Sequence, residues 1–518
     1  MRLKPVFWGA CAPILVSIIA AAGTAPALAQ KSKDTMRVAF YQPVRLVDTF
    51  YEGGPEGTVA NRMVFDNLVN FDEEKKEYIS GAASSWKQID PLTMEFKLTE
   101  GIKFSDGQPL TIDDIEYTFK FMMDPTAKYR FQDTRIGWFD KFEKIDATTF
   151  RLKSKEPMAV FLAKLTQFPA VIPKHVHSKL EKREFFGKKP VGTGPYLVTK
   201  IDDQTGITLE RFDGYKHGNV GKPAGQVKYL QIDPVFDAQT QTARMMRGEQ
   251  DLMYSIDRDL AESFSKNPNF QVHVADSISY NFVQLDVKGR SGNKIFTDKR
   301  MRQAVMHAID RNNLRGLLHP AVAKLPSLET VCSPMLKYCD SSVKLPDYDP
   351  AKAKKLMAEA GYPNGFTMPI LTWGEGRDAA EAVAGMWRKV GINATVETAP
   401  FGVFIKKRID GVPAIVTLWD NSVGQPDIDN TAEYYFLPNA RNYNEDPDLL
   451  KWSLEARSEL DPTKRAAIYK RIFDKSNSEA YLMPLNRIPA MVLAQKDVEL
   501  LGGHKHPYGF ELNRIRFK

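Results

Sequence analysis

The stretch Gly101-Ile-Lys-Phe-Ser-Asp-Gly-Gln-Pro-Leu-Thr-Ile-Asp-Asp-Ile-Glu-Tyr-Thr-Phe119 joins a turn to the start of a helix. Asp106 and Gly107 predict a tight turn, because glycine tolerates the positive φ of the last turn position. Thr111 and Asp114 stand three residues apart, which is the spacing of an N-terminal capping box. A helix is therefore expected to begin at this threonine and to end before Asp124-Pro125.

Strands and helices of this kind alternate along the rest of the chain. Half-buried strands are predicted, from alternating apolar and polar residues, at Thr93–Leu98, Thr149–Lys153 and Ile207–Arg211. Helix starts are predicted at the Asp-Pro pairs 349–350, 446–447 and 461–462, and at Thr297. This alternation predicts an α/β class with mixed sheets. Since no long flexible linker separates the lobes, we expect the chain to cross between them more than once.

Length and composition limit the classes of protein that fit. The 518 residues suit roughly two to four lobes of about 150 residues each. Hydrophobic residues make up 43% and charged residues 26%, which excludes disordered, collagen-like and coiled-coil chains. The formal net charge is +7, but the lysines and arginines are scattered. The charge pattern therefore does not predict a nucleic-acid partner.

The first 29 residues have the three parts of a secretory signal peptide. Arg2 and Lys4 are the only charges before Lys31, an apolar run follows, and Ala27-Leu28-Ala29 is a small-residue cleavage site. An uncleaved membrane anchor is the alternative, because the uncharged run is long enough to span a bilayer. The prolines in the run and the cleavage motif favour removal, so an exported mature protein from Gln30 is expected.

Two cysteines remain in the mature chain, Cys332 and Cys339, close together in a loop that contains a proline. An even number of cysteines in an oxidising compartment predicts one disulfide bond, with two free thiols as the alternative. A zinc site is not expected, because neither a CxxC motif nor a nearby histidine pair accompanies them.

Local catalytic motifs are missing from the sequence. It has no GxSxG elbow, no HExxH and no GxxxxGK[ST] phosphate loop. We therefore predict a protein that is not an enzyme and that carries no cofactor or resident metal. A secreted carboxylate hydrolase is the alternative from another class, because paired carboxylates can form an active site without a local motif.

A series of segments, in order along the mature chain, resembles one family, the family-5 extracellular solute-binding proteins. These are the dipeptide- and oligopeptide-binding components of ABC importers. The matching segments lie at 81–86, 94–98, 101–119, 191–196, 212–215, 280–281, 300–311, 348–353, 359–362, 387–392 and 461–465. One such motif carries little weight, but their order and spacing make the resemblance specific.

The resemblance implies a clamshell of the type II periplasmic binding protein kind, with two lobes of mixed sheets and an extra α/β domain. By analogy, the parts are residues 31–60, 188–285 and 490–518 for the first lobe, 61–187 for the extra domain and 286–489 for the second lobe. It also implies a periplasmic monomer that captures peptides between its lobes. The captured peptide would pass to an inner-membrane ABC permease and its ATPase.

Ligand contacts are implied by the same resemblance. In the peptide binders an aspartate pairs with the ammonium of the peptide, and Asp420 matches it best, next to Trp419 at the end of an apolar run. A buried carboxylate needs such a partner. The segment is longer here than in dipeptide binders, so Asp427 is the alternative. Trp419 is expected to form a flat apolar wall of the site.

Further contacts are expected from the loop after residue 372 and from three single residues. Trp373 lies in a loop that lines the pocket in relatives, and Arg377 stands nearest to an arginine that some dipeptide binders use for the peptide carboxylate. Tyr41, Asn281 and Tyr443 are the remaining candidates. A non-peptide solute (a nickel chelate, haem, a sugar or an opine-like compound) is the alternative ligand, and His504 and His506 are the only hint of nickel.

Overall fold

The computed structural model describes residues 32–52, 54–72, 75–129, 132–166, 170–215, 222–254, 256–320, 324–419, 426–501 and 511–518. Within them, Asp34–Lys518 form one compact unit. No helix of the described ranges is long and apolar enough to cross a membrane. The predicted signal segment, residues 1–29, lies outside these ranges.

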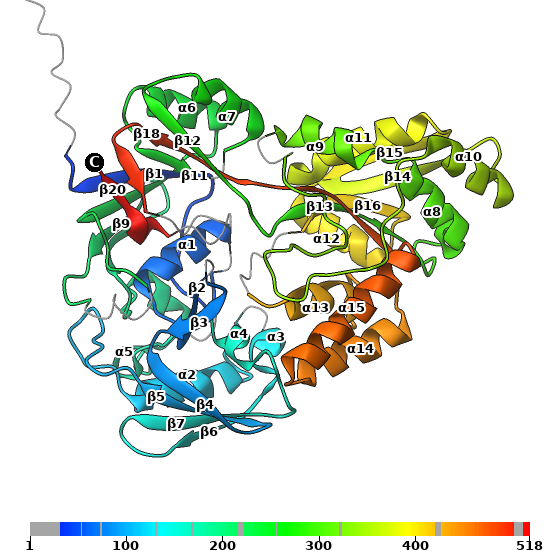
Figure 1. The fold of residues 1–518 in the computed structure, drawn as a ribbon. Coiled ribbons are helices and arrows are strands. Elements are labelled where there is room, and N and C mark those ends of the chain that lie inside the picture. The colour runs from blue at the N-terminus through cyan, green and yellow to red at the C-terminus, as the bar shows by residue number, and fades with distance from the viewer. Residues whose placement is uncertain are drawn as a thin grey trace, which may run out of the picture. The chain divides into compact units, whose positions relative to one another are not determined.

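A seven-stranded mixed sheet draws its strands from widely separated parts of the chain (Figure 1). Its order is β12 (Phe270–Ala275), β18 (Ala490–Gln495), β11 (Leu252–Tyr254), β1 (Thr35–Phe40), β10 (Tyr229–Pro234), β9 (Gly206–Arg211) and β8 (Tyr196–Asp202). β1 pairs in parallel with both β10 and β11, so the centre of the sheet is parallel. Helices α6 (Ala238–Met246) and α7 (Arg258–Ser265) follow β10 and β11.

A five-stranded sheet follows in the second half of the chain. Its order is β15 (Ile392–Ala399), β14 (Phe366–Trp373), β16 (Ala414–Trp419), β13 (Tyr280–Leu285) and β17 (Leu482–Arg487). β14 is parallel to β15 and β16, whereas β13 is antiparallel to β16 and β17. The two sheets together confirm the predicted α/β class with mixed sheets.

Helices cover both faces of the five-stranded sheet (Figure 1). One face packs against α8 (Lys299–His307), α9 (Arg311–Leu318), α10 (Pro350–Glu359) and α11 (Arg377–Arg388). The other packs against α13 (Asp429–Phe436), α14 (Pro447–Ser458) and α15 (Pro462–Ser478). Successive strand residues point to opposite faces, so Val283 and Phe282 of β13 enter different cores and the whole strand is buried.

The remaining elements lie mostly between residues 55 and 188. A four-stranded sheet has the order β4 (Ala83–Asp90), β5 (Thr93–Leu98), β7 (Thr149–Ser154) and β6 (Phe139–Lys144), and β2 (Val69–Asp72) pairs with β3 (Glu77–Ser80). The helices here are α1 (Pro55–Val64), α2 (Ile112–Met123), α3 (Gln132–Ile136), α4 (Phe161–Leu165), α5 (Lys174–His177) and η1 (Arg183–Lys188). Elsewhere lie α12 (Phe401–Asp410), η2 (Ile295–Thr297), η4 (Gly374–Gly376), η5 (Leu512–Arg514), β19 (Val498–Leu500) and β20 (Ile515–Phe517).

The turn and helix predicted from residues 101–119 are confirmed. The backbone nitrogen and hydroxyl of Thr111 both donate to the carboxylate of Asp114, at 3.0 and 2.7 Å, and α2 begins at the next residue. Gly107 has a φ of +87°, as the turn requires. α2 ends at Met123, directly before Asp124-Pro125. The sequence signal was accurate here because every contact that fixes this segment is local.

The helix caps predicted elsewhere are confirmed except for one, which is displaced by a single residue. The Asp349, Asp446 and Asp461 side chains accept backbone N–H groups of the helices that follow them, as predicted. The predicted start at Thr297 is wrong, because Asp298 is the N-cap of α8 and accepts from the backbone of Arg300 at 2.8 Å. Threonine and aspartate are both good caps, so neighbouring candidates compete and the sequence alone does not choose.

The chain passes between the two large sheets twice, as residues 276–279 and 488–489, which we call the paired crossings. The crossings are bonded to each other: Ile488 N donates to Ser279 O at 3.0 Å, and the hydroxyl of Ser277 donates to Ile488 O at 2.5 Å. Sheet membership therefore places the first change of sheet before β13 rather than after residue 285. As boundaries of lobes, the ranges derived from the sequence stay predictions.

Cys332 and Cys339 are joined by a disulfide bond, with their Cα atoms 5.8 Å apart. Cys332 is buried in the same core as Tyr280, whose hydroxyl donates to Val331 O at 2.7 Å. The disulfide loop therefore packs against Tyr280, the first residue of β13, which directly follows the crossing at 276–279.

Candidate functional site

Three parallel strands end together at one edge of the five-stranded sheet. Trp373 ends β14, Ala399 ends β15 and Trp419 ends β16. Ligands of open α/β sheets bind in the crevice outside the carboxyl ends of such strands. We therefore take this carboxyl edge as the candidate functional site.

The paired crossings leave from the same edge. Tyr280, at the start of β13, stands opposite Trp419 on one side and Arg487 on the other. In the seven-stranded sheet, Ala275 and Ala490 lie just beyond the carboxyl end of β11. The crossings thus join the carboxyl edge of one sheet to that of the other, and short hydrogen-bonded connections of this kind are where hinge rotation is absorbed.

Tyr41 lies at the carboxyl edge of the seven-stranded sheet, directly after β1. Its side chain is half-buried, and burial raises the pKa of its hydroxyl, with further contributions from Asp257 and Asp237. The predicted ligand role of Tyr41 stays a prediction, but the residue stands on an edge that the crossings connect to the candidate site.

The two tryptophans of the candidate site have different surroundings. Trp419 is 1% exposed and stacks on Tyr280, with ring centroids 5.2 Å apart and planes at 23°. Its ring packs in the core, and its predicted role as a ligand wall stays a prediction. Trp373 is only half-buried and contacts Phe401 of α12 edge-to-face at 5.1 Å, and Phe401 is 54% exposed. The accessible aromatic surface of this edge therefore belongs to Trp373 and Phe401.

Asn281 is buried in β13 and pairs with a second amide. Its Nδ2 donates to Oδ1 of Asn486 at 3.1 Å, and Asn486 donates in turn to the carbonyl of Arg487 at 3.1 Å. Oδ1 of Asn281 has no partner among the described residues. A buried amide pair is costly unless it is satisfied, so the open acceptor marks this end of the β13–β17 ladder as unusual.

A small cavity lies beside the end of β17, with room for about one water molecule. Its described lining consists of Arg315, His319, Leu325, Pro326, Leu328, Asn486 and Arg487. Burial lowers the pKa of His319 to about 4, Arg258 lowers it further and Asp378 opposes them, so its imidazole is neutral at pH 7. We call this space the α9–β17 cavity.

Asp427 does not lie free for a ligand ammonium, as the alternative prediction required. Its two carboxylate oxygens accept from Arg465 at 2.7 and 2.8 Å, and both side chains are almost fully buried. Burial would lower the pKa of Arg465, but Tyr469 and Asp427 outweigh it and raise that pKa. The charge of Asp427 is therefore balanced within the fold.

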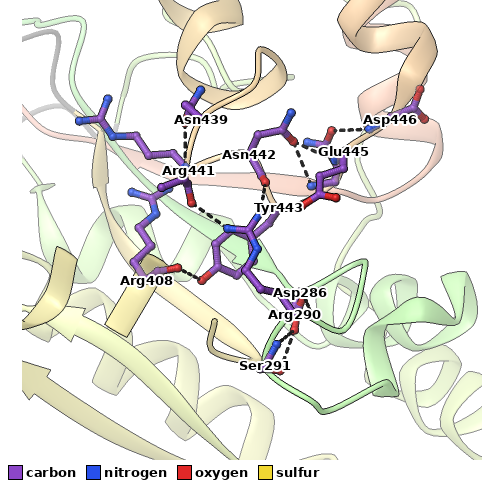
Figure 2. A network of polar contacts seen from close by, with 12 residues as sticks. Asp286, Arg290, Ser291, Arg408, Asn439, Arg441, Asn442, Tyr443, Glu445 and Asp446 are labelled. Carbon is purple, nitrogen blue, oxygen red and sulfur yellow. Dashed lines mark hydrogen bonds and ion pairs between the residues drawn. The ribbon is translucent and has the colours of Figure 1, made fainter. Parts of the chain in front are cut away.

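Tyr443 belongs to a polar network that holds the segment before α14 (Figure 2). Its hydroxyl donates to Arg408 O at 2.5 Å, and the guanidinium of Arg290 lies 4.5 Å from the centre of its ring. Arg290 also donates to Asn442 O at 2.7 Å and pairs with Glu445 at 2.8 Å (Figure 2). The hydroxyl and the ring of Tyr443 thus have partners within the protein, and its predicted contact with a ligand stays a prediction.

Arg377 and Asp420 are the last two candidates from the sequence, and only Arg377 is among the described residues. Arg377 begins α11 directly after η4, at the carboxyl end of β14, and its side chain is exposed. Asp420 and residues 421–425, together with His504 and His506, lie outside the described residues. Asp420 is nonetheless the residue that follows β16 in the chain.

Sequence reasoning missed the residues of the α9–β17 cavity. One signal was present: Arg311, Arg315 and His319 are spaced by four, which places them on one face of a helix. No sequence pattern links that face to Arg487, which joins it only through the fold. Among the described residues, no group of three or more His, Cys, Asp or Glu side chains could hold a metal ion.

The sequence matches the profile of the bacterial extracellular solute-binding proteins, family 5, over residues 77–442. The chain therefore belongs to this family. That membership confirms the resemblance seen in the sequence, and family 5 consists of binding proteins rather than enzymes. The chain is thus a solute-binding protein, and the hydrolase alternative is not supported.

Individual relatives agree in length and fold. The glutathione-binding protein GsiB of Escherichia coli O1:K1 is 27% identical over 448 residues, which cover 81% of this chain and 82% of GsiB. The substrate-binding protein CtaP of Listeria monocytogenes matches with a TM-score of 0.82 and 19% identity, over 94% of this chain and 100% of CtaP. A dipeptide-binding protein of Pseudoalteromonas sp. SM9913, in complex with Met-Leu, gives a TM-score of 0.76 and 19% identity, over 93% and 100%. These structures support the two-lobed binding-protein fold.

Proposed function

We propose that this family-5 protein captures a peptide or a peptide-like solute between the carboxyl edges of its two large sheets. The observation that carries the proposal is the pair of crossings, which connects those two edges and bonds one connection to the other. A ligand held between the edges would favour the closed form by its differential affinity for that form. An inner-membrane permease with its ATPase would then receive the solute.

The ligand class is supported by relatives and by the aromatic surface of the site. GsiB is named for glutathione, and the Pseudoalteromonas protein holds Met-Leu, so both relatives take short peptides. Trp373 and Phe401 provide accessible rings at the candidate edge, where they would contact side chains of a bound peptide. We assign the pairing of the peptide ammonium to Asp420, the residue after Trp419.

The proposed location is the periplasm, with residues 1–29 as a signal peptide that is removed. The protein would act there as a monomer. N-terminal sequencing of protein purified from a bacterial periplasm tests the first point, and an N-terminus at Gln30 is expected. Retention of Met1 in the membrane fraction would instead support the anchor alternative.

Native mass spectrometry of freshly purified protein tests the ligand class, followed by calorimetric titration with Met-Leu, glutathione and a nickel–histidine chelate. We expect retained masses of peptides and binding without turnover. Asp420→Asn should lose affinity for a free peptide, whereas N-acetylated Met-Leu should bind the wild type as weakly as Met-Leu binds the variant. Retention of a metal chelate or a sugar, with no peptide bound, would favour the non-peptide alternative.

A further inference from the structure

We propose that the α9–β17 cavity is a subsite for one oxygen of a carboxylate group of the bound solute, with Arg315 and Arg487 as its main donors. The proposal rests on the proposed function and deepens it, because it names the chemistry of one end of the ligand. The cavity lies at the carboxyl end of β17, next to the paired crossings, so a group bound there would sit at the candidate edge.

Nitrogen atoms without hydrogen-bond partners, two of them arginine donors, are concentrated on the cavity lining. The Nε atoms of Arg315 and Arg487 are buried and have no partner among the described residues, and neither has Nδ1 of His319. Buried donors in native proteins almost always have a partner, which is a protein group, a water or a ligand. The two arginine nitrogen atoms around this cavity therefore require an acceptor oxygen, and carboxylate oxygens accept without donating.

The charges of the lining also favour an anion. Arg487 is balanced by Asp276, since its Nη1 donates to that carboxylate at 2.6 Å. Arg315 donates to Leu325 O at 2.8 Å and to the side-chain oxygen of Asn312 at 2.9 Å, both uncharged groups. None of the described lining residues is acidic. A positive charge thus remains beside the cavity, and an incoming carboxylate would be paired there.

The sequence suggested a different residue, Arg377, as the partner of the ligand carboxylate. Arg377 is exposed at the start of α11, and its side chain makes no hydrogen bond or ion pair with a residue in the described ranges. A guanidinium that is already bonded to protein oxygens loses less side-chain freedom on binding than an exposed one does. Arg315 is fixed in this way and Arg377 is not, which favours the cavity as the carboxylate site.

Two synthetic libraries of peptides of two to five residues test the proposal, one with free carboxylates and one with C-terminal amides. Wild-type protein is incubated with each, and retained peptides are identified by native mass spectrometry. The tightest peptide and its amide are then titrated by calorimetry. We expect the acid to bind about 10- to 100-fold more tightly than the amide, the range for hydrogen bonds to a charged group.

Arg315→Gln should bring this acid-to-amide ratio close to one. Arg311→Gln is the matched control, because Arg311 lies one turn earlier on α9 and donates to Leu328 O at 2.7 Å but does not line the cavity. It should keep the wild-type ratio. Circular dichroism and thermal unfolding check that both variants fold, and the wild-type ratio tests the proposal even if one of them does not.

The outcomes separate this proposal from the proposed function. Equal binding of acids and amides by the wild type would overturn the carboxylate subsite, with the cavity holding a water only, and would leave peptide capture standing. Loss of the acid preference in Arg377→Gln but not in Arg315→Gln would overturn it as well. Retention of neither library would refute peptide capture itself, and the subsite with it.

Discussion

Two groups of arginines border the second large sheet, and they differ in how the fold balances their charge. Near α13–α15, Arg465 holds Asp427 with two bonds of 2.7 and 2.8 Å, and Arg457 holds Asp429 at 2.8 Å. At the α9–β17 cavity, Arg315 contacts only neutral acceptors and keeps an open Nε. Charges that the fold satisfies stabilise it, whereas an unsatisfied one is available to a ligand. The following predictions test that distinction.

Asp427→Ala should give the largest effect. It leaves the buried guanidinium of Arg465 without its carboxylate, and breaking such a pair costs about 4 kcal/mol of folding free energy. Chemical denaturation followed by circular dichroism measures the loss. If the variant instead kept its stability and lost peptide binding, Asp427 would be the ligand acid and the first arginine group would be a site as well.

Trp419→Ala and Trp373→Ala extend the comparison to aromatic side chains. Trp419 is buried and stacked, so its removal should cost about 3 kcal/mol, at the low end for a core tryptophan because a strand end can relax. Trp373 is half-buried, so its removal should leave the unfolding midpoint nearly unchanged and weaken peptide binding. Calorimetry and thermal unfolding of both variants give the two values. A reversed pattern would restore Trp419 as the ligand wall.

Asp48→Asn tests a buried carboxylate of which one oxygen, Oδ2, has no partner among the described residues. Asp48 is 1% exposed, and burial raises its pKa to about 6, above the ordinary 3.8, against two backbone N–H groups that lower it. A raised pKa means that the charged carboxylate is disfavoured in the folded state. It therefore leaves the folding stability unchanged below pH 4, where the acid is protonated, and lowers the stability by the full amount above pH 6. The variant should therefore gain about 2 to 3 kcal/mol relative to wild type between pH 4 and pH 8.

The change in unfolding midpoint of Asp48→Asn with pH is measured by scanning calorimetry at several pH values. Asp251→Asn is unsuitable as a control because Arg37 pairs with that carboxylate. Asp340, which is exposed, is a better choice, and its asparagine variant should show little dependence on pH. If the difference in stability between Asp48→Asn and the wild type did not change with pH, the second carboxylate oxygen of Asp48 would be solvated in the folded state.

Arg315→Gln should give the smallest effect on stability, below about 1 kcal/mol, because the glutamine amide can keep a bond to Leu325 O and no carboxylate loses its partner. Its effect on binding should nevertheless be the largest of the arginine variants. A loss of stability as large as that of Asp427→Ala would show that Arg315 belongs with the structural arginines.

Several features were predictable from the sequence because their causes are local. The turn at Gly107, the capping box of α2 and the aspartate caps depend on residues a few positions apart. The family motifs are short as well, and their order sufficed to indicate the fold. The one helix start that was wrong, Thr297, failed where two good caps stand side by side.

The surroundings of the candidate site residues were harder to predict, because these residues meet through the sheet. The sequence brought attention to Trp419, Asp427 and Tyr443, which are chemically suited to ligands, but packing gives each of them a partner inside the protein. Conversely, Phe401 was not among the candidates from the sequence, and its contact with Trp373 is seen only in the folded chain. Residue type alone does not reveal whether a polar or aromatic group is already satisfied.

The sequence by itself determined the class of fold, the local caps and turns, and membership in a family of solute-binding proteins. Tertiary structure alone decided which charges are balanced and which edge gathers the site. Arg315 and Arg487 are 172 positions apart, yet they line one cavity because β17 lies beside α9. Hydrogen bonding and burial depend on neighbours in space, and only the folded chain fixes those neighbours.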